Sequence, residues 1–173
     1  LSSLVGSEMC IRDSNNGSSF GVSKVDRTKN LREAIREARK YSEDVIIEKA
    51  YNVAEYTVGI LKGEALQPLE IIAEDNKGFY DYEAKYLSKA TKKVEVVDKN
   101  IKEELKNIAL KAFYKHGCQT WGRVDFVYDG KNLGVLEINT VPGFTEKSLF
   151  PLAAKLSGIN YQELITNIIE DSI

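Results

Sequence analysis

The stretch Trp121–Gly143, WGRVDFVYDGKNLGVLEINTVPG, decides how the C-terminal part of this chain folds. Residues 121–128 alternate with a period of two, Asp129 and Gly130 form a turn pair, and an extended pattern resumes over residues 133–139. This pattern predicts a β-hairpin.

Four polar side chains of the hairpin fall on one face. A period of two places Arg123 and Asp125 together on the first strand, and Glu137 and Asn139 together on the second. With a loop over residues 129–133, Asp125 lies opposite Glu137 and Arg123 opposite Asn139. Two opposed carboxylates destabilise a sheet unless a positive group lies between them. Carboxylate and amide oxygens suit Mg²⁺, whose coordination is usually completed by substrate phosphates.

The alternative is an ordinary solvated sheet face. We favour the metal site for two reasons. Asp and Asn are poor strand residues, and the reverse face is uniformly apolar, formed by Val124, Phe126, Leu136 and Ile138.

Composition restricts the class of protein. The chain has 173 residues, of which 43% are apolar and 29% charged, with a net charge of -2 and a pI near 5.6. This slightly acidic balance lacks the excess of positive charge that is typical of proteins that bind nucleic acid or an anionic membrane surface. No apolar run approaches the roughly 18 residues of a membrane span. Cys10 and Cys118 form no disulfide or metal-ligand pattern, so we expect a reducing, cytoplasmic setting.

Residues 1–14, LSSLVGSEMCIRDS, have no hydrophobic period and no signal-peptide layout, and the first residue is Leu. They resemble a translated library-adapter sequence. The alternative is an ordinary flexible N-terminus. We expect a non-native leader that contributes no core contacts.

The rest of the chain mixes strands and helices, which predicts an α+β fold. We expect a glycine- and serine-rich loop over 15–24, strands over 44–50, 55–61 and 65–73, and helices over 31–41, 98–116, from Pro151, and from Asn160 to the C-terminus. Residues 76–93, which include FYDYEAKY, break all periodicity, and long loops of this kind are often lids.

Several motifs occur in one order: GSSFGVSKV over 17–25, IIEK over 46–49, FYDYEAKY over 79–86, GRVDF over 122–126 and LEINTVPGFTEKSLFP over 136–151. Together they resemble the D-alanine–D-alanine ligases, ATP-grasp enzymes of peptidoglycan synthesis. The resemblance covers residues 15–173, about the C-terminal half of such an enzyme. It implies part of the central ATP-grasp lobe over 15–72 and the C-terminal lobe over 73–173.

The resemblance implies that ATP phosphorylates a first D-alanine to an acyl phosphate, which the amine of a second D-alanine attacks. It also implies Mg²⁺ or Mn²⁺ bound by Asp125, Glu137 and Asn139. Arg123 and the N–H group of Gly143 would then stabilise the oxyanion of the tetrahedral intermediate. The intact enzyme is expected to be a homodimer.

The same resemblance assigns residues to the substrates. The adenine of ATP is read by the strand that carries Glu48, Lys49 and Tyr51. Glu55 binds the ribose, Leu136 lies under the base, Phe79 belongs to the nucleotide site, and Lys85 contacts the phosphates. Ser18 and Tyr86 close the lid over the first D-alanine, and Ser148 and Leu149 bind the carboxylate of the second.

The chain also departs from the family. Phe144 stands where many members have Met, a change found in ligases that make D-alanyl-D-lactate, but Tyr86 and Leu149 keep the dipeptide-ligase pattern. The N-terminal substrate domain and two ATP-binding lysines are missing, and the strand of the second lysine falls around Arg12. We therefore expect the chain alone to be inactive. Two alternatives remain: another ATP-grasp carboxylate–amine ligase, and a non-catalytic nucleotide-binding module.

Overall fold

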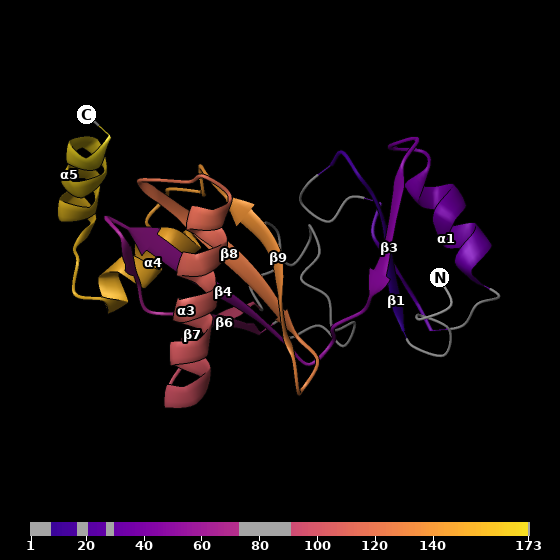
Figure 1. The fold of residues 1–173 in the computed structure, drawn as a ribbon, viewed down its shortest axis with the longest axis horizontal. Coiled ribbons are helices and arrows are strands. Elements are labelled where there is room, and N and C mark those ends of the chain that lie inside the picture. The colour runs from indigo at the N-terminus through magenta and orange to yellow at the C-terminus, as the bar shows by residue number, and fades with distance from the viewer. Residues whose placement is uncertain (1–7, 17–20, 27–29, 73–90, 173) are drawn as a thin grey trace. The chain divides into compact units, whose positions relative to one another are not determined.

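The computed structural model describes residues 8–16, 21–26, 30–72 and 91–172. The chain divides into two compact units, one of residues 1–52 and 73–91 and the other of residues 53–72 and 92–173 (Figure 1). Both contain antiparallel strands and helices, so the predicted α+β class is confirmed.

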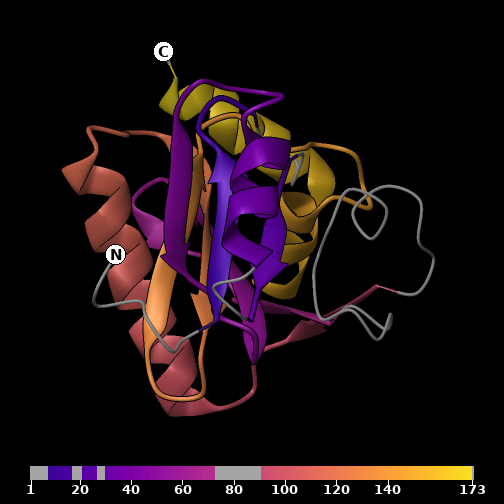
Figure 2. The same cartoon turned by 90° about the vertical axis from the view of Figure 1, so that its right-hand side faces the viewer.

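The first unit contains a three-stranded antiparallel sheet. Its strands are β1 (Met9–Asp13), β2 (Ser23–Val25) and β3 (Val45–Lys49), in the order β2-β1-β3. Helix α1 (Leu31–Ala38) packs on this sheet and runs along it in Figure 2. Ala34 and Ala38 of α1 are buried in the same apolar cluster as residues of β1 and β2.

The first strand corrects one expectation. Residues 1–14 were expected to make no core contacts, yet Met9, Ile11 and Asp13 are buried. The reason is topological, since β1 is the central strand of its sheet and its alternate side chains point into the core. The expectation is wrong for residues 9–13, and residues 1–7 lie outside the described part of the chain.

The second unit contains a larger antiparallel sheet. Its strands are β4 (Ala54–Leu61), β5 (Glu64–Ala65), β6 (Leu69–Ile72), β7 (Lys92–Glu95), β8 (Trp121–Tyr128) and β9 (Leu133–Asn139). Five of them follow the order β7-β6-β4-β8-β9, and β5 pairs with β4. We expected residues 15–72 to form one lobe. Instead, residues 53–72 belong to the second unit, because β4 pairs with β8 along its whole length.

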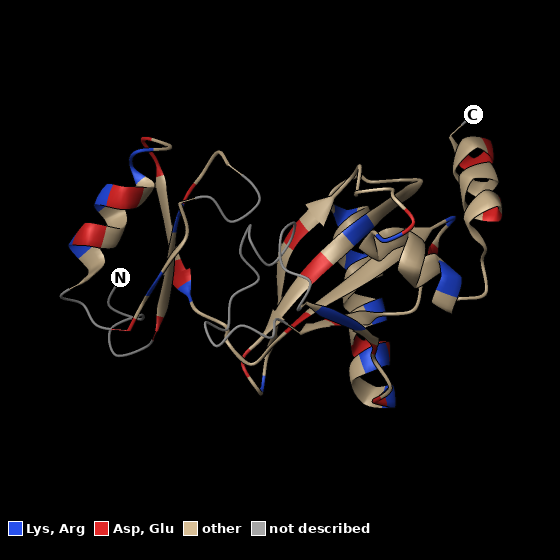
Figure 3. Cartoon of the chain, turned by 180° about the vertical axis from the view of Figure 1, so that it is seen from behind, with Lys and Arg blue, Asp and Glu red and all other residues tan. Residues whose placement is uncertain are grey.

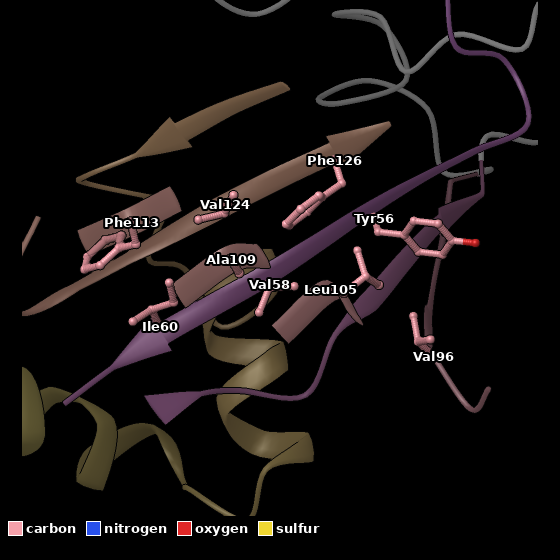
Figure 4. Packing of buried hydrophobic residues seen from close by; sticks show 9 residues of the cluster. All are labelled: Tyr56, Val58, Ile60, Val96, Leu105, Ala109, Phe113, Val124 and Phe126. Carbon is pink, nitrogen blue, oxygen red and sulfur yellow. The ribbon is translucent and has the colours of Figure 1, made fainter. Parts of the chain in front are cut away.

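One face of the large sheet packs on helix α3 (Lys99–Lys115). Figure 4 shows the core between them, in which Leu105, Ala109 and Phe113 of the helix meet side chains of β4 and β8. As predicted, the Asp98 side chain caps the helix by accepting hydrogen bonds from the N–H groups of Asn100 and Ile101. The helix ends before Gly117, whose φ of 79° favours glycine.

The opposite face carries helix α4 (Leu149–Leu156). A Cβ atom at Gly59 of β4 would lie 3.0 Å from the Phe150 ring, so α4 packs directly on the sheet there. We expected this helix to open at Pro151, but it begins two residues earlier. Helix α5 (Tyr161–Asp171) starts with the predicted capping box, in which Asn160 and Glu163 exchange hydrogen bonds with each other's N–H groups.

Most of the expected lid, residues 76–90, lies outside the described residues. Lys92 and Lys93, at the end of the expected lid, form part of β7. Within the described ranges, no helix is long and apolar enough to cross a membrane.

Cys10 offers a test of β1 in solution. Burial raises the pKa of its thiol from 9.0 to about 11, and the carboxylate of Glu48 adds to this effect. At pH 8 this leaves about 100-fold less thiolate than an unperturbed thiol has. We expect iodoacetamide to modify Cys10 at least about tenfold more slowly in the folded chain than in the chain unfolded in guanidinium, measured by peptide mass spectrometry. Equal rates would mean that β1 is not part of the folded sheet.

Candidate functional site

The hairpin β8–β9 has the predicted pairing at its polar end. Arg123 lies opposite Asn139, and Asp125 lies opposite Glu137, so the predicted opposition of the carboxylates is confirmed. The loop is one residue shorter than we expected, because Tyr128 pairs with Leu133 rather than with Gly134. A bulge between Asp125 and Phe126 absorbs the difference. It also corrects the expected apolar face, since Leu136 at the bulge is 40% exposed.

The Asp125 carboxylate is the most highly connected group of this face. Arg123 binds it through two hydrogen bonds, from Nε to Oδ1 at 2.8 Å and from Nη2 to Oδ2 at 2.7 Å. The Thr57 hydroxyl donates to Oδ1 at 2.6 Å, and the Asn139 amide donates to Oδ2 at 3.0 Å. A carboxylate has about four acceptor positions, so its capacity is filled by residues of three adjacent strands.

Glu137 is connected to this network through Asn139. The Asn139 amide nitrogen also donates to the Glu137 Oε1 atom, at 3.3 Å, and so bridges the two opposed carboxylates. Arg123 therefore supplies the positive charge that opposed carboxylates require, and the amide adds hydrogen bonds to both of them. Figure 3 shows acidic and basic segments side by side on β8 and β9.

The donor set fits a small divalent cation. Two carboxylates and one amide converge on one face, and all three offer the oxygen ligands that Mg²⁺ prefers. The described residues contain no cluster of three or more His, Cys, Asp or Glu side chains placed for a metal, so a site here depends on the Asn139 amide. Ligation by Asn139 needs its side chain turned so that Oδ1 replaces the nitrogen.

Thr57 is a site residue that sequence reasoning missed. Thr57 is a residue of β4 that pairs with Asp125 of β8, and it is 1% exposed. Its hydroxyl group donates its hydrogen bond to the Asp125 carboxylate. The available signal was a small hydroxyl residue within the mostly apolar run of β4. This signal is weak, because Thr is a common strand residue.

The loop after β9 lies on the same side of the sheet as α4. Phe144 packs against Trp121, Phe150 and Tyr161, with ring centroids 5.5–6.2 Å apart, and the Tyr161 hydroxyl donates to the Phe144 carbonyl oxygen. Gly143 is exposed, and a Cβ atom there would lie 3.3 Å from the Ser148 hydroxyl oxygen. The absence of a side chain thus lets the Gly143 backbone approach Ser148 closely.

Ser148 and Leu149 stand at the start of α4. The Ser148 hydroxyl does not cap the helix; it accepts a hydrogen bond from the Thr145 N–H group at 3.0 Å and pairs with the Thr145 hydroxyl at 2.8 Å. The first N–H groups of a helix have no partner within the helix. The beginning of α4, without a side-chain cap, is thus suited to an anion.

The residues expected at the nucleotide lie in both units. On β3, Glu48 forms an ion pair with Arg12 at 2.9 Å, and next to it the Lys49 ammonium lies 5.2 Å from the ring centre of Tyr51. Glu55 of β4 and Leu136 of β9 belong to the second unit. Ser18, Phe79, Lys85 and Tyr86 lie outside the described residues, so their assigned roles remain predictions.

Comparison with known proteins agrees with this geometry. The model of the family described as the C-terminus of D-Ala–D-Ala ligases matches residues 3–170. The chain belongs to this family.

Individual members of the family extend the comparison. The D-alanine–D-alanine ligase of Vesicomyosocius okutanii is 44% identical over 158 residues, which cover 90% of this chain and 53% of that protein. The D-alanine–D-alanine ligase of Bacillus anthracis complexed with ATP has a TM-score of 0.79 at 26% identity, over 96% of this chain and 53% of that one. The VanG D-Ala:D-Ser ligase of Enterococcus faecalis has a TM-score of 0.85 at 27% identity. The match covers 99% of this chain and 51% of that one. The chain therefore spans about half the length of the relatives it matches.

Thr57→Val tests the network around Asp125. The change keeps the shape of the side chain and removes the hydrogen bond to a buried carboxylate, so we expect the free energy of unfolding to fall by about 1.5–3 kcal/mol. Urea denaturation followed by circular dichroism measures this change. Thr120→Val, at a partly exposed position outside this network, is the control and should change the stability by less than about 0.5 kcal/mol. Equal effects of the two substitutions would contradict a special role for Thr57.

Proposed function

We propose that this chain provides the metal, phosphate and acceptor-binding part of an ATP-dependent D-alanine–D-alanine ligase, which joins two D-alanines through an acyl phosphate for peptidoglycan precursors. The observation that carries the proposal is a hydrogen-bonded network on one face of the sheet, formed by Arg123, Asp125, Glu137 and Asn139. It occurs in a chain that belongs to this family. The ATP complex of the Bacillus anthracis relative supports ATP as the phosphate donor.

The charged face suits phosphoryl transfer, which depends on positioning and charge neutralisation more than on covalent help. Asp125, Glu137 and Asn139 would hold Mg²⁺ or Mn²⁺, which supplies positive charge to the ATP phosphates. For this, Asn139 turns its oxygen towards the site and releases both carboxylates. Thr57 and the bidentate contact of Arg123 keep the Asp125 carboxylate in one orientation meanwhile.

The loop after β9 suits the second half-reaction. The exposed N–H group of Gly143 and the Arg123 guanidinium would stabilise the oxyanion that forms when the amine attacks the acyl phosphate. Ser148, through its hydroxyl, and Leu149, through its N–H group at the start of α4, would hold the carboxylate of the second D-alanine. The Phe144 aromatic contacts fix this loop relative to α4.

The acceptor itself has one competing candidate. The structural likeness to a D-Ala:D-Ser ligase, with a TM-score of 0.85, favours D-serine as the alternative. We retain D-alanine because the 44% identical relative is named a D-alanine–D-alanine ligase, whereas the D-Ala:D-Ser enzyme is 27% identical.

The activity test uses a chimera in which this chain is joined to the part of the Vesicomyosocius okutanii ligase that it does not cover. We expect phosphate release from ATP that depends on D-alanine. Glu137→Gln should lower kcat/KM by roughly 100-fold or more at ordinary Mg²⁺, because the metal loses a charged ligand. Glu64→Gln, on the exposed strand β5, is the control and should retain the parent rate. Equal rates for the two variants would remove Glu137 from the metal site.

Residues 1–173 alone should release no phosphate in response to D-alanine. Loss of one oxyanion donor already costs roughly 10²–10³ in rate, and loss of the first-substrate domain removes positioning altogether. The measurement is coupled phosphate detection with the purified chain, with the chimera as the positive control. Turnover near that of the chimera would show that these residues form a complete enzyme.

A further inference from the structure

Lys93 is a charged residue of the large sheet that neither the sequence motifs nor the proposed reaction uses. It lies on β7, the edge strand, opposite Ile71, which is itself opposite Glu55 of β4. Directly paired residues share a face of the sheet. Since Glu55 alternates with Thr57 along β4, Lys93 projects from the same face as Asp125 and Arg123.

The contact of Lys93 reaches the loop that follows β9. Its Nζ atom donates a hydrogen bond to the Lys147 carbonyl oxygen at 2.8 Å. Lys147 immediately precedes Ser148, whose N–H group donates to the Thr145 carbonyl oxygen at 2.8 Å. Lys93 thus contacts the Thr145–Ser148 turn, and the preceding residue of the loop, Phe144, packs in a ring cluster.

A lysine on an edge strand commonly serves only to prevent strand pairing, and then its charge stays in water. Lys93 is partly buried, and this burial together with the positive charge of Arg123 lowers the pKa of its ammonium group. A carbonyl oxygen neutralises none of that charge, and no carboxylate within the described ranges forms an ion pair with it. Burial of a charge beside a like charge is costly unless an anion compensates it.

We propose that Lys93 is a positioning residue for the second substrate: its ammonium group holds the Thr145–Ser148 turn and supplies positive charge to a carboxylate bound at Ser148. This inference rests on the proposed ligase reaction for the identity of the carboxylate. A phosphate group of ATP has the same anionic chemistry, and the kinetic experiment below separates the two. The ammonium group has three donors, so it can keep the Lys147 carbonyl and still bind an anion.

The first experiment measures hydrogen exchange in residues 1–173 and needs no activity. Lys93→Met should speed exchange of the Ser148 N–H group by about tenfold, the scale of one lost hydrogen bond, while Lys93→Arg restores protection. Lys92→Met, at the exposed neighbouring position, is the matched control and should leave exchange unchanged. Amide groups of α3 should keep their protection in every variant, which excludes global unfolding. Unchanged exchange at Ser148 in Lys93→Met would overturn the positioning role.

The second experiment uses the active chimera and separates the two substrates. We expect Lys93→Met to raise the KM for the second D-alanine by about tenfold, the scale of one charge-assisted hydrogen bond, with little change in the KM for ATP. Lys93→Arg should recover most of the loss, and Lys92→Met should behave as the parent. A rise in the KM for ATP instead would overturn the assignment to the acceptor. An inactive parent chimera would count against the proposed function, while the exchange experiment would still decide whether Lys93 holds the turn.

Discussion

The Asp125 carboxylate is the constraint on which the second unit depends. It is a nearly buried charge, and such a group is tolerated only when hydrogen bonds and an opposite charge compensate its removal from water. Thr57 on β4, Arg123 on β8 itself and Asn139 on β9 provide this compensation. Because a shift of one residue would turn any of these side chains to the other face, the carboxylate also fixes the register of three strands.

The same network explains how the hairpin holds two opposed carboxylates on one face. The Arg123 guanidinium neutralises Asp125, and the neutral Asn139 amide satisfies oxygens of both acids by hydrogen bonds. In the proposed metal site, a bound cation would exchange one set of contacts for another. Thr57 and Arg123 would hold the Asp125 carboxylate through this exchange, while Asn139 turned its oxygen towards the cation.

Sequence reasoning recovered those features that rest on local periodicity. A period of two predicted the polar face of the hairpin, and capping chemistry predicted Asp98 and Asn160 as helix starts. It failed where the deciding contact is distant in the sequence. Thr57 is recruited by a residue 68 positions away, the Leu136 bulge moves the register by a single residue, and Met9–Asp13 acquires its strand structure only from β2 and β3 on either side. In Asp13, one buried carboxylate oxygen has no hydrogen-bond partner among the described residues, a local feature that composition cannot show.

The charges around the site indicate an order of events. Arg123 and Lys93 carry two positive charges on this face, and Glu55, Asp125 and Glu137 carry three negative ones. The chain as a whole has a net charge of -2, so its overall field does not attract anions. A divalent cation held by Asp125 and Glu137 would leave this face with one excess positive charge, which a phosphate or carboxylate could then neutralise at close range. If the chain acts as proposed, affinity for anionic substrates would therefore be created locally, together with the metal.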